Sequence, residues 1–113
     1  MEYEMKKGAE WCYVKPLDAH VGAEDVQDFK IVLKTAVGDG ERHIILDMSE
    51  VSLIDSMGLG TLVSAVQLLK PGHKFVICNP QHALSQILDM TRLDRIFRVF
   101  DTLQEAEEAL SRA

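Results

Sequence analysis

The sequence has no apolar run long enough to cross a membrane, since none approaches the roughly 20 residues that such a helix needs. Residues 1–7 lack the apolar core and the small-residue cleavage site of a signal peptide, so we expect a cytosolic protein without membrane insertion. Cysteine is scarce: only Cys12 and Cys78 occur, both in β-like apolar runs. Two thiols placed in this way are typical of small buried hydrophobic side chains rather than of a disulfide or a metal pair.

Positive charge is also in short supply. The chain has 12 Lys and Arg residues against 18 Asp and Glu residues, which gives a net charge of -6, and the basic residues are dispersed. Nucleic acid is therefore not an expected partner, and a protein with a basic face fits better. The four histidines form no pair at metal-binding spacing, so we expect neither a metal site nor a cofactor: His20, His43, His73 and His82.

What the sequence does contain is a globular pattern. Hydrophobic residues make up 47% of its 113 residues and fall in short separated runs, without repeats, low-complexity segments or long linkers. This length suits one compact core and is too short for two ordinary domains. We expect residues 1–113 to form a single domain.

The first half of the chain predicts a β-hairpin, a helix and a buried strand. The hairpin is expected from strands at 1–6 and 10–15, which are rich in β-favouring side chains. Apolar residues at helical spacing, Ile31 among them, predict an amphipathic helix over 23–37. The nearly all-apolar run 43–48 is typical of a strand that is covered on both faces.

The second half alternates helices and strands. Apolar spacing predicts a helix that opens after Ile54 and ends near Lys70, followed by a strand over 74–78. Asn79-Pro80 predicts the cap and first turn of a helix that reaches about Met90. A strand over 95–100 and a C-terminal helix opened by a capping box at Thr102 complete the chain.

The expected order is therefore β-β-α-β-α-β-α-β-α. It predicts an α/β fold in which a mixed sheet of about five strands is packed by about four helices, with right-handed crossovers between parallel neighbours.

The segment Asp55-Ser56-Met57-Gly58-Leu59-Gly60 is the strongest functional signal, because it joins the buried strand to the following helix. A hydroxyl at Ser56 would lie at a helix N-terminus, where first-turn N–H groups and the helix dipole favour a phosphate. Asp55 is a candidate to cap the helix, orient the serine or contact a partner. Gly58 and Gly60 remove side chains, which would let a partner approach closely. The simpler interpretation makes Ser56 only an N-cap residue.

The same residues do not match the motifs of a hydrolase or of a nucleotide-binding enzyme. A hydrolase elbow has the pattern Gly-x-Ser-x-Gly, whereas Ile54 occupies the first glycine position, and no histidine is placed as a base. The pair Gly58-x-Gly60 is too short for a dinucleotide fingerprint or a P-loop. Asp47, at the end of the buried strand, is expected to accept hydrogen bonds from loop N–H groups. We expect a protein that is not an enzyme.

The chain resembles the STAS family, the domain shared by sulfate transporters and anti-sigma factor antagonists. Most of the chain takes part in this resemblance, although many members have a glycine where this chain has Arg92. The matching segments are 44–51, 54–60, 75–80 and 105–106.

The resemblance implies an anti-sigma factor antagonist of the free-standing bacterial type. In that family the unphosphorylated protein binds an anti-sigma factor and so releases a sigma factor. The anti-sigma factor has a histidine-kinase-like ATPase fold and phosphorylates the serine that corresponds to Ser56, and a metal-dependent phosphatase of the PP2C type reverses the modification. The expected partner-binding residues are Asp18, Asp55, Ser56, Met57, Gly58, Leu59, Gly60, Thr61 and Ser64. Among them, Thr61 and Ser64 are inferred from helical phase, and Asp18 belongs to the loop 18–22, which we expect beside the start of the helix.

Three other functions remain open on the sequence. The chain could be the STAS subunit that regulates an ABC-type lipid transporter by binding its ATPase. It could be a module that senses a nucleotide or another small molecule. It could also be a scaffold in a stress-sensing assembly.

Overall fold

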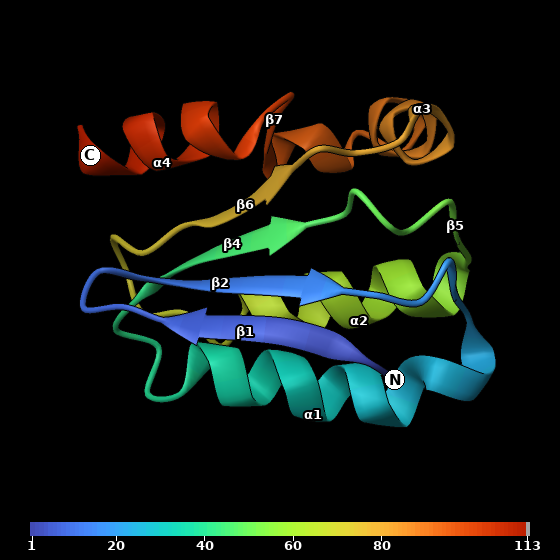
Figure 1. Cartoon of the computed structure of the whole chain (residues 1–113), viewed down its shortest axis with the longest axis horizontal. Coiled ribbons are helices and arrows are strands. Elements are labelled where there is room, and N and C mark those ends of the chain that lie inside the picture. Colours follow the sequence, from blue (N-terminus) through green and yellow to red (C-terminus); the bar gives the residue numbers. More distant parts are fainter. Residues whose placement is uncertain (113) are drawn as a thin grey trace.

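The computed structural model describes residues 1–112 and contains one five-stranded mixed sheet with the strand order β1-β2-β4-β6-β7 (Figure 1). Strand β1 runs antiparallel to β2, and the other neighbouring strands are parallel. The strands are β1 (Tyr3–Lys7), β2 (Trp11–Pro16), β4 (His43–Asp47), β6 (Phe75–Cys78) and β7 (Arg98–Phe100). The helices are α1 (Val26–Val37), α2 (Ser56–Val66), α3 (His82–Met90) and α4 (Leu103–Ser111).

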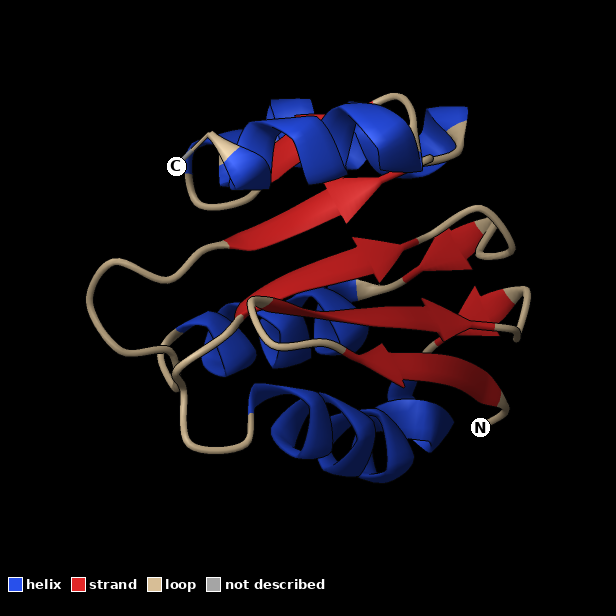
Figure 2. Ribbon diagram, turned by 60° about the vertical axis from the view of Figure 1, so that its left-hand side comes forward, coloured by secondary structure: helices blue, strands red, loops and turns tan. Residues whose placement is uncertain are grey.

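Helices lie on both sides of this sheet (Figure 2). The two central strands β4 and β6 are almost wholly buried, because their alternate side chains enter cores on opposite faces. Ile44 and Leu46 join the larger core, to which α1, α2 and α3 contribute. Ile45 joins the smaller core beneath α4, with Ala106 and Leu110. The α/β class and the mixed five-stranded sheet with four helices are as predicted.

The two cysteines lie on opposite faces of the sheet. Cys12 belongs to the larger core and Cys78 to the smaller one, and both are free and fully buried. Burial raises the pKa of both thiols, that of Cys78 to about 12. Both are therefore small hydrophobic residues of the core, as the sequence indicated.

The structure adds a second sheet that the sequence did not reveal. Strand β3 (His20–Val21) pairs in parallel with β5 (Leu53–Ile54). Each strand has only two residues, so neither leaves a periodic pattern in the sequence. This small sheet fixes the start of α2, as described below.

Several predicted boundaries were wrong. A short 3₁₀ turn, Ala23–Asp25, precedes α1. The strand predicted over 95–100 begins only at Arg98, after a second 3₁₀ turn, Leu93–Arg95. Helix α2 ends at Val66 instead of near Lys70. Ile31, expected on the buried face of α1, is 64% exposed.

The cap of α3 also differs from the prediction. Asn79 has a positive φ of 54°, and the N-cap residue is Gln81, so Asn79-Pro80 forms a turn before the helix. The predicted cap of α4 is confirmed for one of its two hydrogen bonds, because Thr102 Oγ1 accepts from the N–H of Glu105.

None of the helices within residues 1–112 is both long enough and apolar enough to span a membrane.

Candidate functional site

The candidate site is the start of α2. It lies beyond the C-terminal end of β4, where the connection from β4 to β6 begins (Figure 1). The segment between β4 and α2 contributes the buried side chains of Met48 and Val51 to the core and then forms β5. Pairing of β5 with β3 brings the segment 18–22 beside this helix start. The N–H of Asp55 donates to the carbonyl oxygen of Val21 at 3.2 Å, which joins the residue before α2 to the end of β3.

Asp55 is the N-cap residue of α2. Its extended backbone conformation lets Oδ1 accept hydrogen bonds from the N–H groups of Met57, at 3.0 Å, and Gly58, at 3.1 Å. Its Oδ2 accepts from the N–H of Ala23 at 3.2 Å, which ties the helix start to the turn before α1. Of the three roles considered for Asp55, capping is the one that the geometry displays.

Ser56 is the first residue of α2 and is exposed. The alternative in which Ser56 serves only as the N-cap is therefore wrong, because Asp55 occupies that position. The expectation that free first-turn N–H groups would receive a phosphate also needs correction, since the Asp55 carboxylate already binds those of Met57 and Gly58. A group added to Ser56 would extend into solvent beside a carboxylate.

The two glycines of the first turns differ in their surroundings. A Cβ on Gly58 would lie 2.6 Å from Cγ1 of Ile54 and 3.0 Å from the carbonyl oxygen of Val21, so Gly58 is needed for packing against β5 and β3. A Cβ on Gly60 would meet nothing within 4 Å. The expectation that both glycines serve access is thus wrong for Gly58, which is buried, and compatible with the exposed Gly60.

The remaining predicted partner-binding residues separate into exposed and buried positions. Met57 is 54% exposed and Ser64 is exposed, whereas Leu59 is half-buried against the larger core. Thr61 is only 5% exposed and its hydroxyl donates to the carbonyl oxygen of Met57, so its prediction as a surface residue was wrong. Helical phase alone had placed Thr61 outward, but α1 covers that side of α2. Asp18 is half-buried in the loop that leads to β3.

Comparison with known proteins decides the family. The model of the STAS domain family matches residues 6–106. The chain belongs to the STAS domain family.

Similar proteins carry related names. A Thermotoga maritima protein, named as a candidate anti-sigma factor antagonist, is 33% identical to this STAS domain over 84 residues, which are 74% of each chain. A crystal structure of such a protein from the same organism has a TM-score of 0.82 and 27% identity, and covers 96% of this chain and 94% of its own.

The anti-sigma factor antagonist SpoIIAA shares the fold. Its unphosphorylated form has a TM-score of 0.81 at 16% identity, with 99% of this chain and 98% of that one covered. The phosphorylated form of the Bacillus protein has a TM-score of 0.72 at 17% identity, with 96% and 99% covered.

Two further side chains of this STAS domain, neither of them predicted as a site residue, lie at the start of α2. Leu53, in β5, is 51% exposed two residues before Asp55. The His20 ring packs over Gly22, where a Cβ would lie 2.8 Å from His20 Cε1 and 3.0 Å from Asp55 Oδ2. The predicted loop 18–22 gave a hint of His20, whereas Leu53 had no signal because its strand is too short.

A buried polar cluster lies at the end of β4, beneath the loop that leads to the site. Asp47 is 5% exposed and accepts hydrogen bonds from Tyr13 Oη at 2.6 Å, the N–H of Ser49 at 3.0 Å and Asn79 Nδ2 at 3.2 Å. Burial raises the pKa of Asp47, but these hydrogen bonds outweigh burial and leave its pKa below the ordinary value. The predicted loop N–H contact is confirmed, and the contact with Tyr13 on β2 is additional.

Proposed function

We propose that this STAS domain is an anti-sigma factor antagonist. In its unphosphorylated form it binds an anti-sigma factor and thereby releases a sigma factor. The names of the Thermotoga maritima relative and of the fold neighbours support this assignment. The observation that carries it is an exposed serine, Ser56, on the first turn of a helix whose start is held rigidly by Asp55.

The proposed switch is phosphorylation of Ser56. An anti-sigma factor with a histidine-kinase-like ATPase fold transfers the phosphate, and a PP2C-type phosphatase removes it. The exposed position of Ser56 supports access by both enzymes. The existence of SpoIIAA in unphosphorylated and phosphorylated forms with this fold supports a modification that leaves the fold intact.

The proposed docking surface surrounds Ser56. It combines the apolar side chains of Met57 and Leu53, which are about half exposed, with Gly60 and Ser64 farther along α2. Gly60 offers a partner close approach to the helix backbone. Asp18 borders the same surface from the loop 18–22, and Gly58 and Leu59 hold the helix from beneath.

The switch acts at this interface through charge and volume. A phosphoserine carries about -1.5 to -2 charges at neutral pH. On Ser56 this charge would lie next to the Asp55 carboxylate, whose oxygens already bind the nearby N–H groups. The phosphate would therefore stay at the surface, repel acidic groups of the partner and block its approach.

The phosphorylation site can be tested directly. The protein is incubated with the candidate anti-sigma factor and ATP, and the added phosphate is located by mass spectrometry. We expect modification at Ser56 that is lost in Ser56→Ala and retained in Ser85→Ala, the matched variant at an exposed serine of α3 outside the docking surface. Phosphate on another residue, or a stable complex with a transporter ATPase that ignores the state of Ser56, would contradict the proposal.

A further inference from the structure

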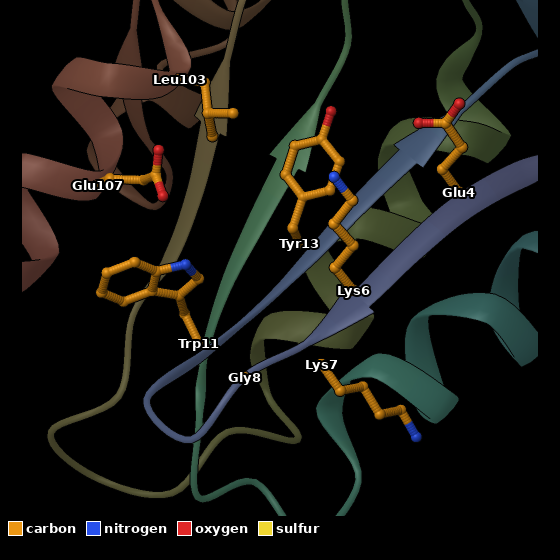
Figure 3. Close-up of a pocket in the computed structure, with 8 residues that line it drawn as sticks. All are labelled: Glu4, Lys6, Lys7, Gly8, Trp11, Tyr13, Leu103 and Glu107. Atoms are coloured by element: carbon orange, nitrogen blue, oxygen red, sulfur yellow. The ribbon is translucent and has the colours of Figure 1, made fainter.

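A hollow of about 310 Å³ lies between the β1–β2 hairpin and α4 (Figure 3). Trp11 and Tyr13 of β2 form its floor, and both are half-buried. Leu103 and Glu107 of α4 line one side, and Lys6 of β1 lines the other. A second hollow, of about 390 Å³, adjoins Trp11 on the side of the hairpin turn.

The hollow exists because α4 covers only part of its face of the sheet. Helix α4 packs on the central strands through Ile45 and Val76, and the aromatic side chains of β2 border this core. The hydroxyl of Tyr13 donates to Asp47 at 2.6 Å, which fixes the ring in the floor. The Tyr13 part of the aromatic floor is therefore held in place before any ligand arrives, so binding would not have to order this side chain.

The charges around the floor favour a cation above Trp11. In Figure 3 the carboxylate of Glu107 points into the hollow on the side of Trp11, whereas Lys7 points away from it. The Nζ atom of Lys6 lies 5.9 Å from the centre of the Tyr13 ring, so that ring already carries a cation. Trp11 offers the better aromatic face for a second one, and Glu10 adds a carboxylate in the adjoining hollow.

We propose that this hollow binds an arginine side chain of a partner protein. The guanidinium group stacks on the Trp11 indole and pairs with the Glu107 carboxylate. Arginine suits this geometry better than lysine, because its guanidinium is planar, stacks on aromatic faces and forms two parallel hydrogen bonds with a carboxylate. The net charge of -6 favours the approach of a basic partner.

The arginine site is separate from the phosphorylation site. Trp11 pairs with His43, the first residue of β4, whereas Ser56 follows the far end of that strand. Trp11 and Ser56 therefore lie toward opposite ends of the strands of the sheet. The inference does not depend on the proposed function.

Trp11 is the only tryptophan of the chain, so its fluorescence reports on this site alone. The purified protein is titrated at constant ionic strength with N-acetylarginine amide and, separately, with N-acetylcitrulline amide, a neutral compound of nearly the same shape. We expect a saturable change with the arginine compound and affinity for the citrulline compound that is weaker by about threefold or more.

Two variants locate the carboxylate. Glu107→Gln should weaken arginine binding by about threefold or more, whereas Glu105→Gln, which removes the same charge from an exposed position of α4 outside the hollow, should leave it unchanged. Higher salt should weaken binding to the unaltered protein.

The proposal is overturned by equal responses to the two compounds, by equal effects of the two variants, or by no saturable response. A saturable response to AMP that is lost in Lys6→Gln would also overturn it, because the hollow would then be a site for an aromatic anion.

Discussion

The carboxylate of Asp55 and the N–H of Ala23 form a hydrogen bond of 3.2 Å across 32 residues of sequence. The same carboxylate caps α2 through Met57 and Gly58. One side chain thus fixes the start of the helix that carries Ser56 and the turn before α1.

Removal of this carboxylate should destabilise the protein. We expect Asp55→Ala to lower the free energy of unfolding by about 1–2 kcal/mol, because the first-turn N–H groups lose their acceptor. Asp55→Asn should cost less, since the amide oxygen still caps the helix. Urea unfolding midpoints give the comparison, and equal stability of the unaltered protein and Asp55→Ala would show that the cap contributes nothing.

The glycines of α2 offer a matched pair. Gly58→Ala should lower the free energy of unfolding by about 1–3 kcal/mol, because the new methyl group overlaps Ile54 and the carbonyl oxygen of Val21. Gly60→Ala should raise it by up to about 1 kcal/mol, because alanine is the better helix former and nothing lies nearby. Thermal unfolding of both variants tests this difference of sign, and a loss of stability in both would contradict it.

Arg92 departs from the glycine that many family members carry, and its backbone has φ 62° and ψ 19°. The left-handed conformation strains a residue with a Cβ. We expect Arg92→Gly to raise the free energy of unfolding by up to about 1 kcal/mol, after the greater freedom of glycine in the unfolded chain is subtracted. Arg95→Gly, three residues on at a position without positive φ, should lower it. The prediction fails if the two variants change stability in the same direction.

The hydrogen bond between Tyr13 and Asp47 predicts a particular pH dependence. Because the pKa of Asp47 is lowered in the folded protein, its ionisation stabilises the fold above the ordinary value of 3.8. This contribution is lost as the pH falls through the lowered pKa. Tyr13→Phe removes one donor, so it should cost about 1–3 kcal/mol at neutral pH and make stability less dependent on pH in the acid range.

Unfolding free energies between about pH 2 and pH 7 measure this effect. Tyr3→Phe is the control, since Tyr3 is an exposed tyrosine of the neighbouring strand. If both variants kept the stability and the acid dependence of the unaltered protein, the Asp47 cluster would not have the stabilising role assigned to it.

Regular elements could be predicted because their patterns are local. The apolar run at β4 and the helical spacing of α1 and α2 each indicate one element without reference to the rest of the chain. The order of strands and helices followed from these patterns, and with it the mixed sheet. The position of Ser56 at the start of α2 followed in the same way.

Contacts between distant residues could not be predicted. Tyr13 and Asp47 are 34 residues apart, and no local pattern joins them. Thr61 was misplaced because helical phase does not reveal which neighbouring helix covers a face. Gly58 was predicted to be accessible, although the Ile54 side chain and the Val21 carbonyl oxygen crowd it. These two groups are brought together by the pairing of the short strands β3 and β5, which the sequence did not reveal.

The central claim is tested most directly by the affinity of the protein for its candidate anti-sigma factor before and after phosphorylation of Ser56. Ser56→Asp supplies the charge without the kinase, and Ser85→Asp supplies the same charge on an exposed serine of α3. We predict tight binding of the unmodified protein and of Ser85→Asp, and binding weakened by about tenfold or more for the phosphorylated protein and Ser56→Asp. Undiminished binding of both the phosphorylated protein and Ser56→Asp would contradict the account.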